Sequence, residues 1–256
     1  MYEGVMIAAT GIQSQQKRLD TVADNIANVN TAGFKGARLE FKDALFTAGF
    51  GPTATPEGNQ QKGHGVMTMS VRKRTADGSI QVTNNKLDFA LEGDGLLELE
   101  DNRGNLVYTR AGNLYSTVRA DGRTYLCNSQ GFYVLNEEGA RIEIPEDTQD
   151  ISVAEDGTIE FTTAGGPVFD KFGIYTFTNK TGLLSVGKSN FEPSAASGGK
   201  QLSADTKIMQ GALENSNVDL SVEMTMLVRS QRAFSLASRA LSTADEMEGI
   251  ANNLRR

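Results

Sequence analysis

The stretch NIANVNTAGFK, residues 25–35, lies where a helix near the N-terminus is expected to end, and it contains three asparagines. Asparagine is a poor helix former because its side chain offers the backbone other hydrogen-bond partners. Gly33 suits the left-handed conformation that often follows a helix, so we expect the helix to stop near residues 30–31. Some other interaction must therefore offset the cost of these amides.

Upstream of this stretch, apolar residues recur with a seven-residue period, in steps that alternate between three and four. This spacing predicts a helix with a narrow apolar seam of the coiled-coil kind. One row of the seam comprises Val5, Ile12, Leu19 and Ile26, and the other comprises Ala8, Gln15, Val22 and Val29.

The C-terminal segment repeats this period, which predicts a second, longer helix over residues 219–254. Asn217 is suited to cap its start, because a side-chain amide oxygen accepts hydrogen bonds from the first free N–H groups of a helix. Two narrow seams can pair with each other. In the second helix one row comprises Leu220, Leu227, Phe234 and Leu241, and the other comprises Met224, Gln231 and Ser238.

Asn25 and Asn28 lie beside the first seam, and two interpretations account for them. In the first interpretation they only fray the end of the helix. In the second they face neighbouring subunits and make side-chain hydrogen bonds between helices. We adopt the second as the expectation, because a buried polar group without a partner costs about 1–3 kcal/mol and a packed assembly must satisfy it.

The middle of the chain has the pattern of short strands. In SIQVTNNKLDFALEG, residues 79–93, Leu87, Phe89 and Leu91 alternate with polar residues and should share one face. Further on, Asp-Gly, Gln-Gly and Glu-Gly pairs separate β-like runs. Regularly spaced strands and turns of this kind predict an all-β domain of the sandwich or barrel-like type.

The expected fold class is therefore α+β, with paired coiled-coil-like terminal helices and a central all-β domain. The expected inner, helical part comprises residues 1–46 and 205–256. An extended joint over 47–65 and a flexible joint over 192–204 bracket a β-domain over 66–191. The first joint is rich in glycine and proline, which predicts no regular structure when it is free.

Composition excludes several classes of function. The net charge is −7 with a pI near 4.9 and no basic patch, which argues against nucleic-acid binding. Cys127 and His64 are the single residues of their types, so we expect no disulfide, no metal site, no cofactor and no catalytic set. The chain shows neither a secretory signal nor an apolar run long enough to insert into a membrane.

Three stretches of the sequence resemble flagellar axial proteins of the rod and hook type. They are LDTVADNIANVNTAGFKGARLEF at 19–41, LEGDGLLELEDNRGNLVYTRAGNL at 91–114 and GALENSNVDLSVEMTMLVRSQRAFSLASRALSTADEM at 211–247. The family pattern at the first helix end is an Asn-rich segment followed by Asn-Thr-x-Gly-(Phe/Tyr)-Lys. Chain length and the single β-domain are most similar to the distal rod protein or to a sister rod protein of similar size.

The resemblance implies a structural subunit that is not an enzyme and that self-assembles through its terminal helices into a helical tube. It implies a location in the flagellar basal body, export by the flagellar type III apparatus without a cleaved signal, and torque transmission around an export channel. Implied partners are further copies of the chain, other rod and hook proteins, and surrounding ring proteins. The joint at 47–65 either locks axial contacts between subunits or serves only as a linker.

The assembly interface implied by the periodicity and the resemblance lies on the two helices and the helix-end stretch. It comprises Ile12, Leu19, Val22, Asn25, Ile26, Asn28, Asn30, Thr31, Gly33, Phe34, Lys35, Asn217, Leu220, Met224, Leu227, Gln231, Arg232, Phe234 and Leu241. Alternatives are a hook-type axial protein, a β-domain hydrolase or carbohydrate-binding protein with helical oligomerisation arms, and an adhesin-like surface protein. The absence of paired catalytic acids and the few aromatics disfavour the second, and the absent signal disfavours the third.

Overall fold

The computed structural model describes residues 2–44, 46–48, 61–119, 121–187, 189–203 and 205–253. These residues form two compact units. The helical unit comprises Met1–Ala27, Ala37–Lys73 and Asp219–Arg256, and the β-unit comprises Asn28–Gly36 and Arg74–Val218. The chain therefore passes from one unit to the other at four places.

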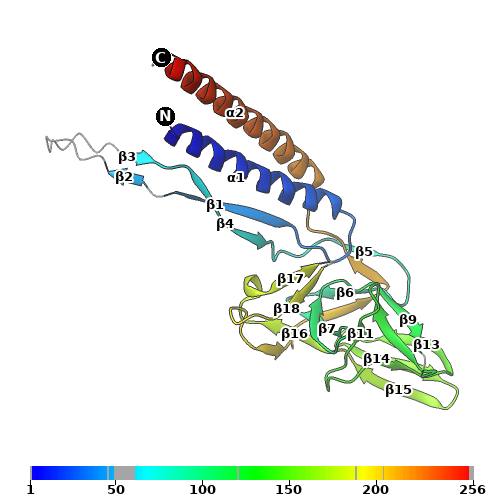
Figure 1. Cartoon of the computed structure of the whole chain (residues 1–256). Helices are drawn as coiled ribbons and strands as arrows, with labels where there is room; N and C mark the ends of the chain where they lie inside the picture. The colour runs from blue at the N-terminus through cyan, green and yellow to red at the C-terminus, as the bar shows by residue number, and fades with distance from the viewer. Residues whose placement is uncertain are drawn as a thin grey trace. The chain divides into compact units, whose positions relative to one another are not determined.

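The helical unit contains two long helices and a long hairpin (Figure 1). Helix α1 spans Tyr2–Ala27 and packs against helix α2, which spans Leu220–Asn253. Strands β1 (Ala37–Asp43) and β4 (Val66–Lys73) form an antiparallel ladder that contacts α1. Strands β2 (Phe46–Ala48) and β3 (Gln61–Gly63) pair with each other. Within this unit α1 lies between α2 and the β1–β4 ladder (Figure 1).

This hairpin changes the expected domain boundaries. The expected start of the β-domain at residue 66 falls on the first residue of β4, which belongs to the helical unit together with its partner strand β1. The β-unit instead begins at Arg74. The described residues of the expected joint are 47–48 and 61–65, of which 47–48 and 61–63 belong to the β2–β3 ladder, and residues 49–60 lie outside the described part of the chain.

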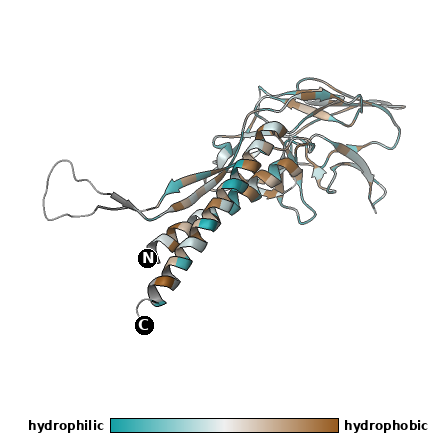
Figure 2. Cartoon of the chain, turned by 90° about the horizontal axis from the view of Figure 1, so that it is seen from above, coloured by the Kyte–Doolittle hydropathy of each residue, from teal (hydrophilic) through white to brown (hydrophobic). Residues whose placement is uncertain are grey.

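The seam predicted for the first helix has partners on α2. All residues of its two rows within α1 are buried or half-buried, and Val22 is only 6% exposed. The helix ends at Ala27, a few residues before the expected end, and Gly33 has the expected left-handed conformation with φ +65°. Figure 2 shows apolar residues interspersed with polar residues along both helices, as expected for helices with one apolar side.

The seam predicted for the second helix is half correct. Leu227, Phe234 and Leu241 are half-buried, but Met224 is 54% exposed and Gln231 is exposed. The second inward row lies one residue earlier. It comprises Glu223, Ser230, Ala237 and Ala244. Three of these positions carry small side chains, which let the helix backbones approach, whereas Met224 and Gln231 of the predicted row are exposed and Ser238 is half-buried.

The β-unit consists of several antiparallel sheets (Figure 1). Its elements are β5 (Ile80–Val82), β6 (Phe89–Glu92), β7 (Leu96–Glu100), β8 (Leu106–Thr109), β9 (Leu114–Val118), β10 (Thr124–Asn128), β11 (Tyr133–Val134), β12 (Glu143–Ile144), β13 (Thr148–Val153), β14 (Thr158–Thr163), β15 (Gly166–Lys171), β16 (Ile174–Phe177), the 3-10 turn η1 (Lys180–Gly182), β17 (Leu184–Gly187), β18 (Asn190–Glu192), β19 (Lys200–Leu202), β20 (Lys207–Gln210) and β21 (Ala212–Glu214). The largest sheet has the path β12-β10-β11-β7-β8-β18-β17, with β9, β16 and β19 paired beside it. Strands β13-β14-β15 form a second sheet, and the pairs β20-β6 and β21-β5 complete the unit.

Strand β7 lies between two hydrophobic clusters. Leu97 and Leu99 belong to the larger cluster, which also contains Phe89 and Leu91 as predicted. Leu96, on the opposite face, belongs to a smaller cluster with four aromatic residues: Tyr108, Tyr175, Phe177 and Phe191. A strand with both faces buried is the central element of this unit.

The predicted turns are present, but the predicted second joint is not. Gly122, Gly131 and Gly139, from the Asp-Gly, Gln-Gly and Glu-Gly pairs, all have positive φ. Residues 192–204 contain strand β19, paired with β16, and a turn closed by the Ser197 hydroxyl and the Ser194 carbonyl at 2.7 Å. Serine side chains of this kind substitute for backbone partners, so a Ser- and Gly-rich composition is compatible with an ordered turn.

Candidate functional site

The helix-end stretch identified in the sequence continues as a short segment, Asn28–Gly36, that packs with the β-unit; we call it the strap. The N–H group of Gly33 donates to the carbonyl of Glu214 at 2.8 Å. A Cβ atom on Gly33 would come within 2.7 Å of the backbone of Arg110 and Ala111. Glycine is therefore required twice at this position, by the left-handed φ and by the close backbone approach. Phe34 follows it and is only 6% exposed.

The strap ends in a buried charge cluster around Lys35. Its ammonium donates to the Glu214 carboxylate at 2.7 Å, to the Ala76 carbonyl at 2.9 Å and to the Asp77 carboxylate at 3.3 Å. The same Glu214 oxygen accepts from the N–H of Gly78 at 2.8 Å. All three donors of the lysine are therefore used.

Arg110 completes the cluster from the other side of Glu214. Its Nε donates to the second Glu214 oxygen at 2.5 Å, and its Nη2 donates to Asp77 at 2.9 Å. Its remaining donors bind the backbone carbonyls of Leu91, Gly93 and Gly95. All five guanidinium donors thus have acceptors, as a buried arginine requires.

The intact cluster adds little to the stability of the fold, but the loss of one of its members is costly. The side chains of Arg110, Glu214 and Lys35 are 4%, 1% and 10% exposed, while Asp77 is 50% exposed. The cluster is formally neutral, with two cations and two carboxylates. A neutral, saturated cluster adds little net stability, but removing one buried partner typically costs about 3–5 kcal/mol because it leaves an uncompensated charge.

Asn217 binds the strap to the segment that follows β4. Its Oδ1 accepts from the N–H of Gly36 at 2.8 Å, and its Nδ2 donates to the carbonyls of Arg74 and Ala76 at 3.2 and 2.7 Å. Asn217 is therefore not the predicted helix cap. The cap is Asp219, whose Oδ1 accepts from the N–H groups of Ser221 and Val222 at 2.9 and 3.2 Å. The side chain of Asn217 makes its three described hydrogen bonds within the β-unit, and Asp219 supplies the oxygen that caps α2.

Within the helical unit, Asn25 is the most deeply buried of the three asparagines. It is 1% exposed, its Oδ1 accepts from the N–H of Ala37 at 2.8 Å, and its Nδ2 donates to the Ala37 carbonyl at 2.8 Å. The interpretation that this amide needs a neighbouring subunit is therefore wrong. The start of β1 satisfies it within the chain.

Comparison with known proteins assigns these features to a family. The model of a flagella basal body rod protein matches residues 6–35, which include the whole helix-end stretch and all but the last residue of the strap. A flagellar hook protein FlgE/F/G D1 domain matches residues 90–161, and a flagellar basal body rod FlgEFG protein C-terminal segment matches 209–254. In an alignment 273 positions long, the chain is 34% identical to the flagellar basal-body rod protein FlgG of Borreliella burgdorferi, with all of both chains covered.

The chain belongs to the FlgG family of flagellar basal-body rod proteins. A FlgG of Agrobacterium fabrum is 36% identical, with 96% of this chain and 97% of the relative covered. The flagellar hook-basal body complex protein FlhP of Bacillus subtilis is 31% identical with both chains fully covered. As a FlgG-family member, the chain is a structural subunit of the flagellar basal-body rod and not an enzyme. The described helices include none that is long and apolar enough to cross a membrane.

The structure divides the predicted interface residues of this FlgG-family chain into three groups. The buried group comprises Val22, Asn25, Gly33, Phe34 and Lys35. The half-buried group comprises Ile12, Leu19, Ile26, Asn28, Thr31, Asn217, Leu227, Phe234 and Leu241. The exposed group comprises Asn30, Leu220, Met224, Gln231 and Arg232. The buried members make their contacts inside the chain, whereas the exposed members have side chains that are accessible to another molecule.

Sequence reasoning missed Arg110, Asp77 and Glu214. Arg110 and Glu214 lie inside stretches that resemble the family, but nothing in their local pattern distinguishes them from surface charges. Lys35 and Glu214 are 179 residues apart. Only the folded chain shows that they meet.

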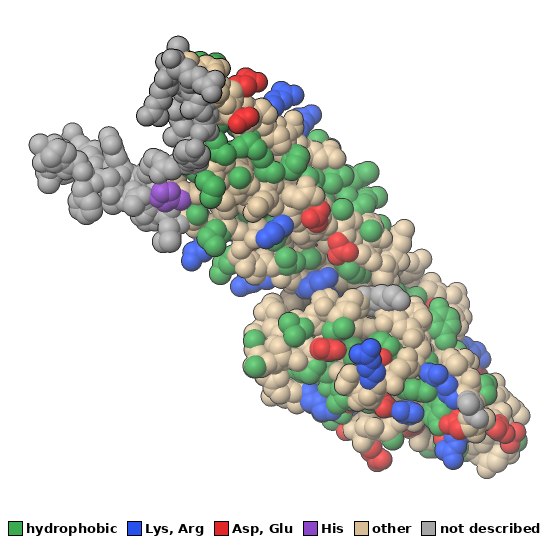
Figure 3. All heavy atoms as spheres, in the orientation of Figure 1, with side chains coloured by type: hydrophobic (Ala, Val, Ile, Leu, Met, Phe, Trp, Pro, Cys, Tyr) green, Lys and Arg blue, Asp and Glu red, His purple; other side chains and the backbone are tan. Residues whose placement is uncertain are grey.

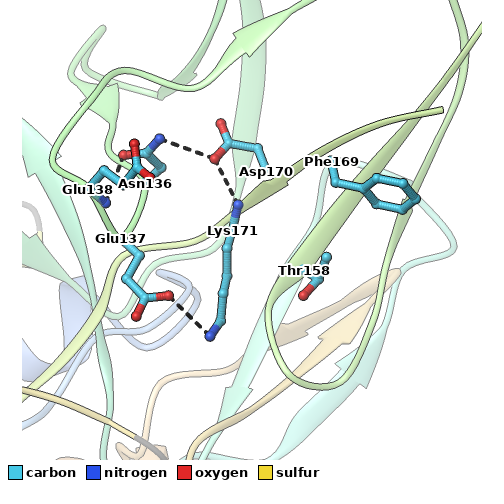
Figure 4. Close-up of a pocket in the computed structure, with 7 residues that line it drawn as sticks. All are labelled: Asn136, Glu137, Glu138, Thr158, Phe169, Asp170 and Lys171. Carbon is cyan, nitrogen blue, oxygen red and sulfur yellow. Dashed lines mark hydrogen bonds and ion pairs between the residues drawn. The ribbon is translucent and has the colours of Figure 1, made fainter. Parts of the chain in front are cut away.

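A pocket of about 710 Å³ in the β-unit is a second candidate site (Figure 4). Four of its polar residues form two pairs: Lys171 pairs with Glu137 at 3.1 Å, and Asn136 donates to Asp170 at 3.1 Å. Figure 4 shows Phe169 pointing away from these groups. The part of the chain that the structure describes holds no cluster of His, Cys, Asp and Glu suited to a metal. The pocket therefore presents no set of free groups for a ligand.

Proposed function

We propose that this chain builds the rod by self-assembly of its terminal helices into the inner wall of a helical tube, which transmits torque and encloses an export channel. The observation that supports this proposal is an apolar ridge on the outward side of α2. Leu220, Met224 and Val228 recur at four-residue spacing and are 42%, 54% and 47% exposed. Side chains four apart lie on one face of a helix.

The ridge has continuations along the same helix. Leu236, Met247 and Ile250 are 65%, 56% and 60% exposed. Hydrophobic side chains are exposed over much of the helical unit in the view of Figure 3. Contiguous exposed apolar surface on a soluble chain marks an interaction site, and further copies of the chain are the partners that a rod subunit requires.

The proposal assigns the predicted interface residues two roles. Residues exposed on α2, such as Met224 and Arg232, contact other copies, while the half-buried rows hold α1 against α2 and so present the ridge. In a helical assembly each contact joins two different patches, because only a heterologous interface continues into a filament. Other rod and hook proteins, surrounding ring proteins and the type III export apparatus are proposed partners by family membership.

A second candidate function is that of a sister protein of the hook-basal body complex. The full-length similarity to FlhP supports it. Both candidates use the same helical assembly, and they differ in the neighbours that they contact in the axial structure.

Electron microscopy of concentrated protein tests the proposed assembly. The wild-type chain should form polymers or rings, and Leu227→Asp should abolish them by placing a charge in the row that holds α2 to α1. Ser116→Asp, which adds the same charge at an exposed position of strand β9, outside the helices, shows whether an added charge blocks assembly wherever it lies. A Leu227→Asp protein that assembles like the wild type would contradict the proposed role of the helices.

A further inference from the structure

We infer that the strap, Asn28–Gly36, is a latch that stays docked on the β-unit whether or not the terminal helices are formed. This inference goes beyond the proposed function, because it concerns the isolated chain and not the assembly. The strap follows α1 directly in the sequence, so its sequence neighbours suggest that it belongs to the helical part. Its contacts assign it to the β-unit.

Backbone hydrogen bonds fix the strap at three points. Gly33 donates to the carbonyl of Glu214 at 2.8 Å, and the carbonyl of Phe34 accepts from the N–H of Asn217 at 3.3 Å. The carbonyl of Gly36 accepts from the N–H of Arg74 at 2.7 Å. All of these partners lie in the β-unit. No hydrogen bond in this set requires α1 or α2.

The Lys35 cluster makes the docked position specific. The ammonium fits a site with three acceptors, one of them on a Glu214 carboxylate that is 1% exposed. If the strap left, Glu214 would keep Arg110 but would lose its second cation, and the Ala76 carbonyl would lose a donor. The Ala76 carbonyl would keep the Asn217 side chain as a donor, so the cost of undocking comes mainly from the buried Glu214 carboxylate, which would lose one of its two counter-charges.

The latch has a geometric consequence for the chain. Glu214 and Asn217, which hold the strap, precede α2 by a few residues, and the strap begins directly after Ala27. The β-unit alone therefore sets the separation of the two points at which the helices depart. Helix pairing starts from ends that are already held in place, which lowers its entropy cost.

Hydrogen exchange of the full-length monomer, followed by mass spectrometry of peptides, tests the latch. Amides of Gly33 and Gly36 should exchange at the rate of strands β20 and β21. They should exchange more slowly than those of α1, by on the order of tenfold or more, because Val22 is the one fully buried apolar residue among the described residues of α1, whereas both hydrophobic clusters lie in the β-unit. Lys35→Met should accelerate exchange of the strap while strands β13–β15 keep their protection. The matched control is Lys86→Met, which removes an exposed ion pair to Asp150 in the same unit.

A second variant keeps the test decisive if Lys35→Met fails to fold. Ile12→Pro interrupts α1 and should increase exchange of that helix without affecting the strap. The inference is overturned if the strap of the wild type exchanges as fast as α1, or if Ile12→Pro releases the strap together with the helix. Assembly is not measured in these experiments, so their outcome is independent of the proposed function.

Discussion

The Asn25 side chain presents a carbonyl oxygen and an amide group to the backbone of Ala37, in the way that a neighbouring strand would. Both bonds are 2.8 Å long and buried. This arrangement explains why an asparagine is present near a helix end despite its poor helix propensity. The amide satisfies the N–H and carbonyl groups of Ala37. These groups face α1, on the side of β1 where the described sheet has no further strand.

Asn25→Ala should destabilise the helical unit by about 1–3 kcal/mol, because it leaves both backbone groups of Ala37 buried without partners. Asn30→Ala is the matched control, since Asn30 is exposed and should tolerate the change. Amide exchange at Ala37 measures the effect directly. Equal protection of Ala37 in the two variants would contradict the assigned role of Asn25.

The strap residue Gly33 meets two requirements, a positive φ and a close approach to another backbone segment. Comparing Gly33→Ala with Gly139→Ala, in a turn of the β-unit, separates them. Both residues have positive φ, +65° and +81°, but a Cβ on Gly139 meets no atom within 4 Å. Gly139→Ala should therefore cost about 1–2 kcal/mol from backbone strain alone. Gly33→Ala should cost about 3 kcal/mol or more, because the new methyl group also clashes with the backbone at Arg110. Calorimetric unfolding of the β-unit compares them, and equal losses would show that close approach is unimportant.

The ion pair between Glu100 and Arg141 predicts a pH dependence of stability. Two guanidinium hydrogen bonds, at 2.7 and 2.9 Å, hold the pKa of the Glu100 carboxyl below its usual value. A lowered folded-state pKa adds stability above the unfolded pKa of about 4.3, and this stability is lost as the pH falls through the folded-state value.

Glu100→Gln should therefore lower the unfolding free energy by about 0.5–1 kcal/mol at neutral pH, given that the pair is partly exposed. The difference from the wild type should shrink as the pH falls below about 4, where the wild-type carboxyl also becomes neutral. Urea unfolding at a series of pH values measures it. A difference that stays constant down to about pH 2 would contradict an ionic origin.

At the scale of elements, α2 shows how far a periodic pattern predicts packing. Three of the four residues predicted for the first row, Leu227, Phe234 and Leu241, are half-buried as expected, but its first member, Leu220, is 42% exposed. The adjacent row was wrong at Met224, because its neighbour Glu223 faces inward instead and hydrophobicity alone favours methionine. Which of two neighbouring residues faces α1 depends on how closely the backbones of α1 and α2 approach, and that distance is a property of the pair of helices.

The strand β1 illustrates a second limit. Its sequence, ARLEFKD, is short and charged, and only pairing with β4 identifies it as a strand. The paired residues Ala37 and Lys73 lie on either side of the joint at 47–65, so the local sequence pattern around one does not identify the other as its partner. Glu214, likewise, is one of 32 acidic residues, and no local feature selects it as the partner of Lys35. The fold class and the strap's glycine were predictable, and the charge cluster was not.

The revised helix cap gives a prediction at this scale. Asp219→Ala should weaken the first turn of α2 by about 0.5–2 kcal/mol and leave the β-unit unchanged, because Asp219 bonds only helix amides among its described partners. Asn217→Ala should do the reverse, since its bonds lie within the β-unit. Exchange of the α2 amides and thermal unfolding of the β-unit give the two readouts. Identical profiles for the two variants would contradict the division of roles.

At the scale of the whole molecule, the chain is two units whose segments alternate along the sequence. The terminal helices and central strands were predicted, but the boundaries between the units were not. The strap follows α1 in the sequence but belongs to the β-unit, and the β1–β4 hairpin, which comes next, belongs to the helical unit. The core of the β-unit lies in its own hydrophobic clusters around β7. The stability of the β-unit therefore has a source inside that unit.

Leu227→Asp should leave the melting temperature of the β-unit within about 2 °C of the wild type, because distant sites without shared partners act additively. Phe172→Ala, which removes a ring that is 2% exposed in the larger cluster, should lower it by many degrees and is the positive control. Differential scanning calorimetry measures both variants. A large decrease for Leu227→Asp would mean that the seam of α2 is part of the core of the β-unit.

The separation of the strap from the rest of the β-unit also bears on engineering by gene exchange. A chimaera that transplants Arg74–Val218 between two axial proteins would carry Arg110, Asp77 and Glu214 but would leave their lysine behind. The transplanted β-unit would then pack with the strap of the acceptor protein, whose backbone shape and lysine position fit a different β-unit. The exchangeable module is therefore discontinuous, and a successful swap must move Asn28–Gly36 together with the strands.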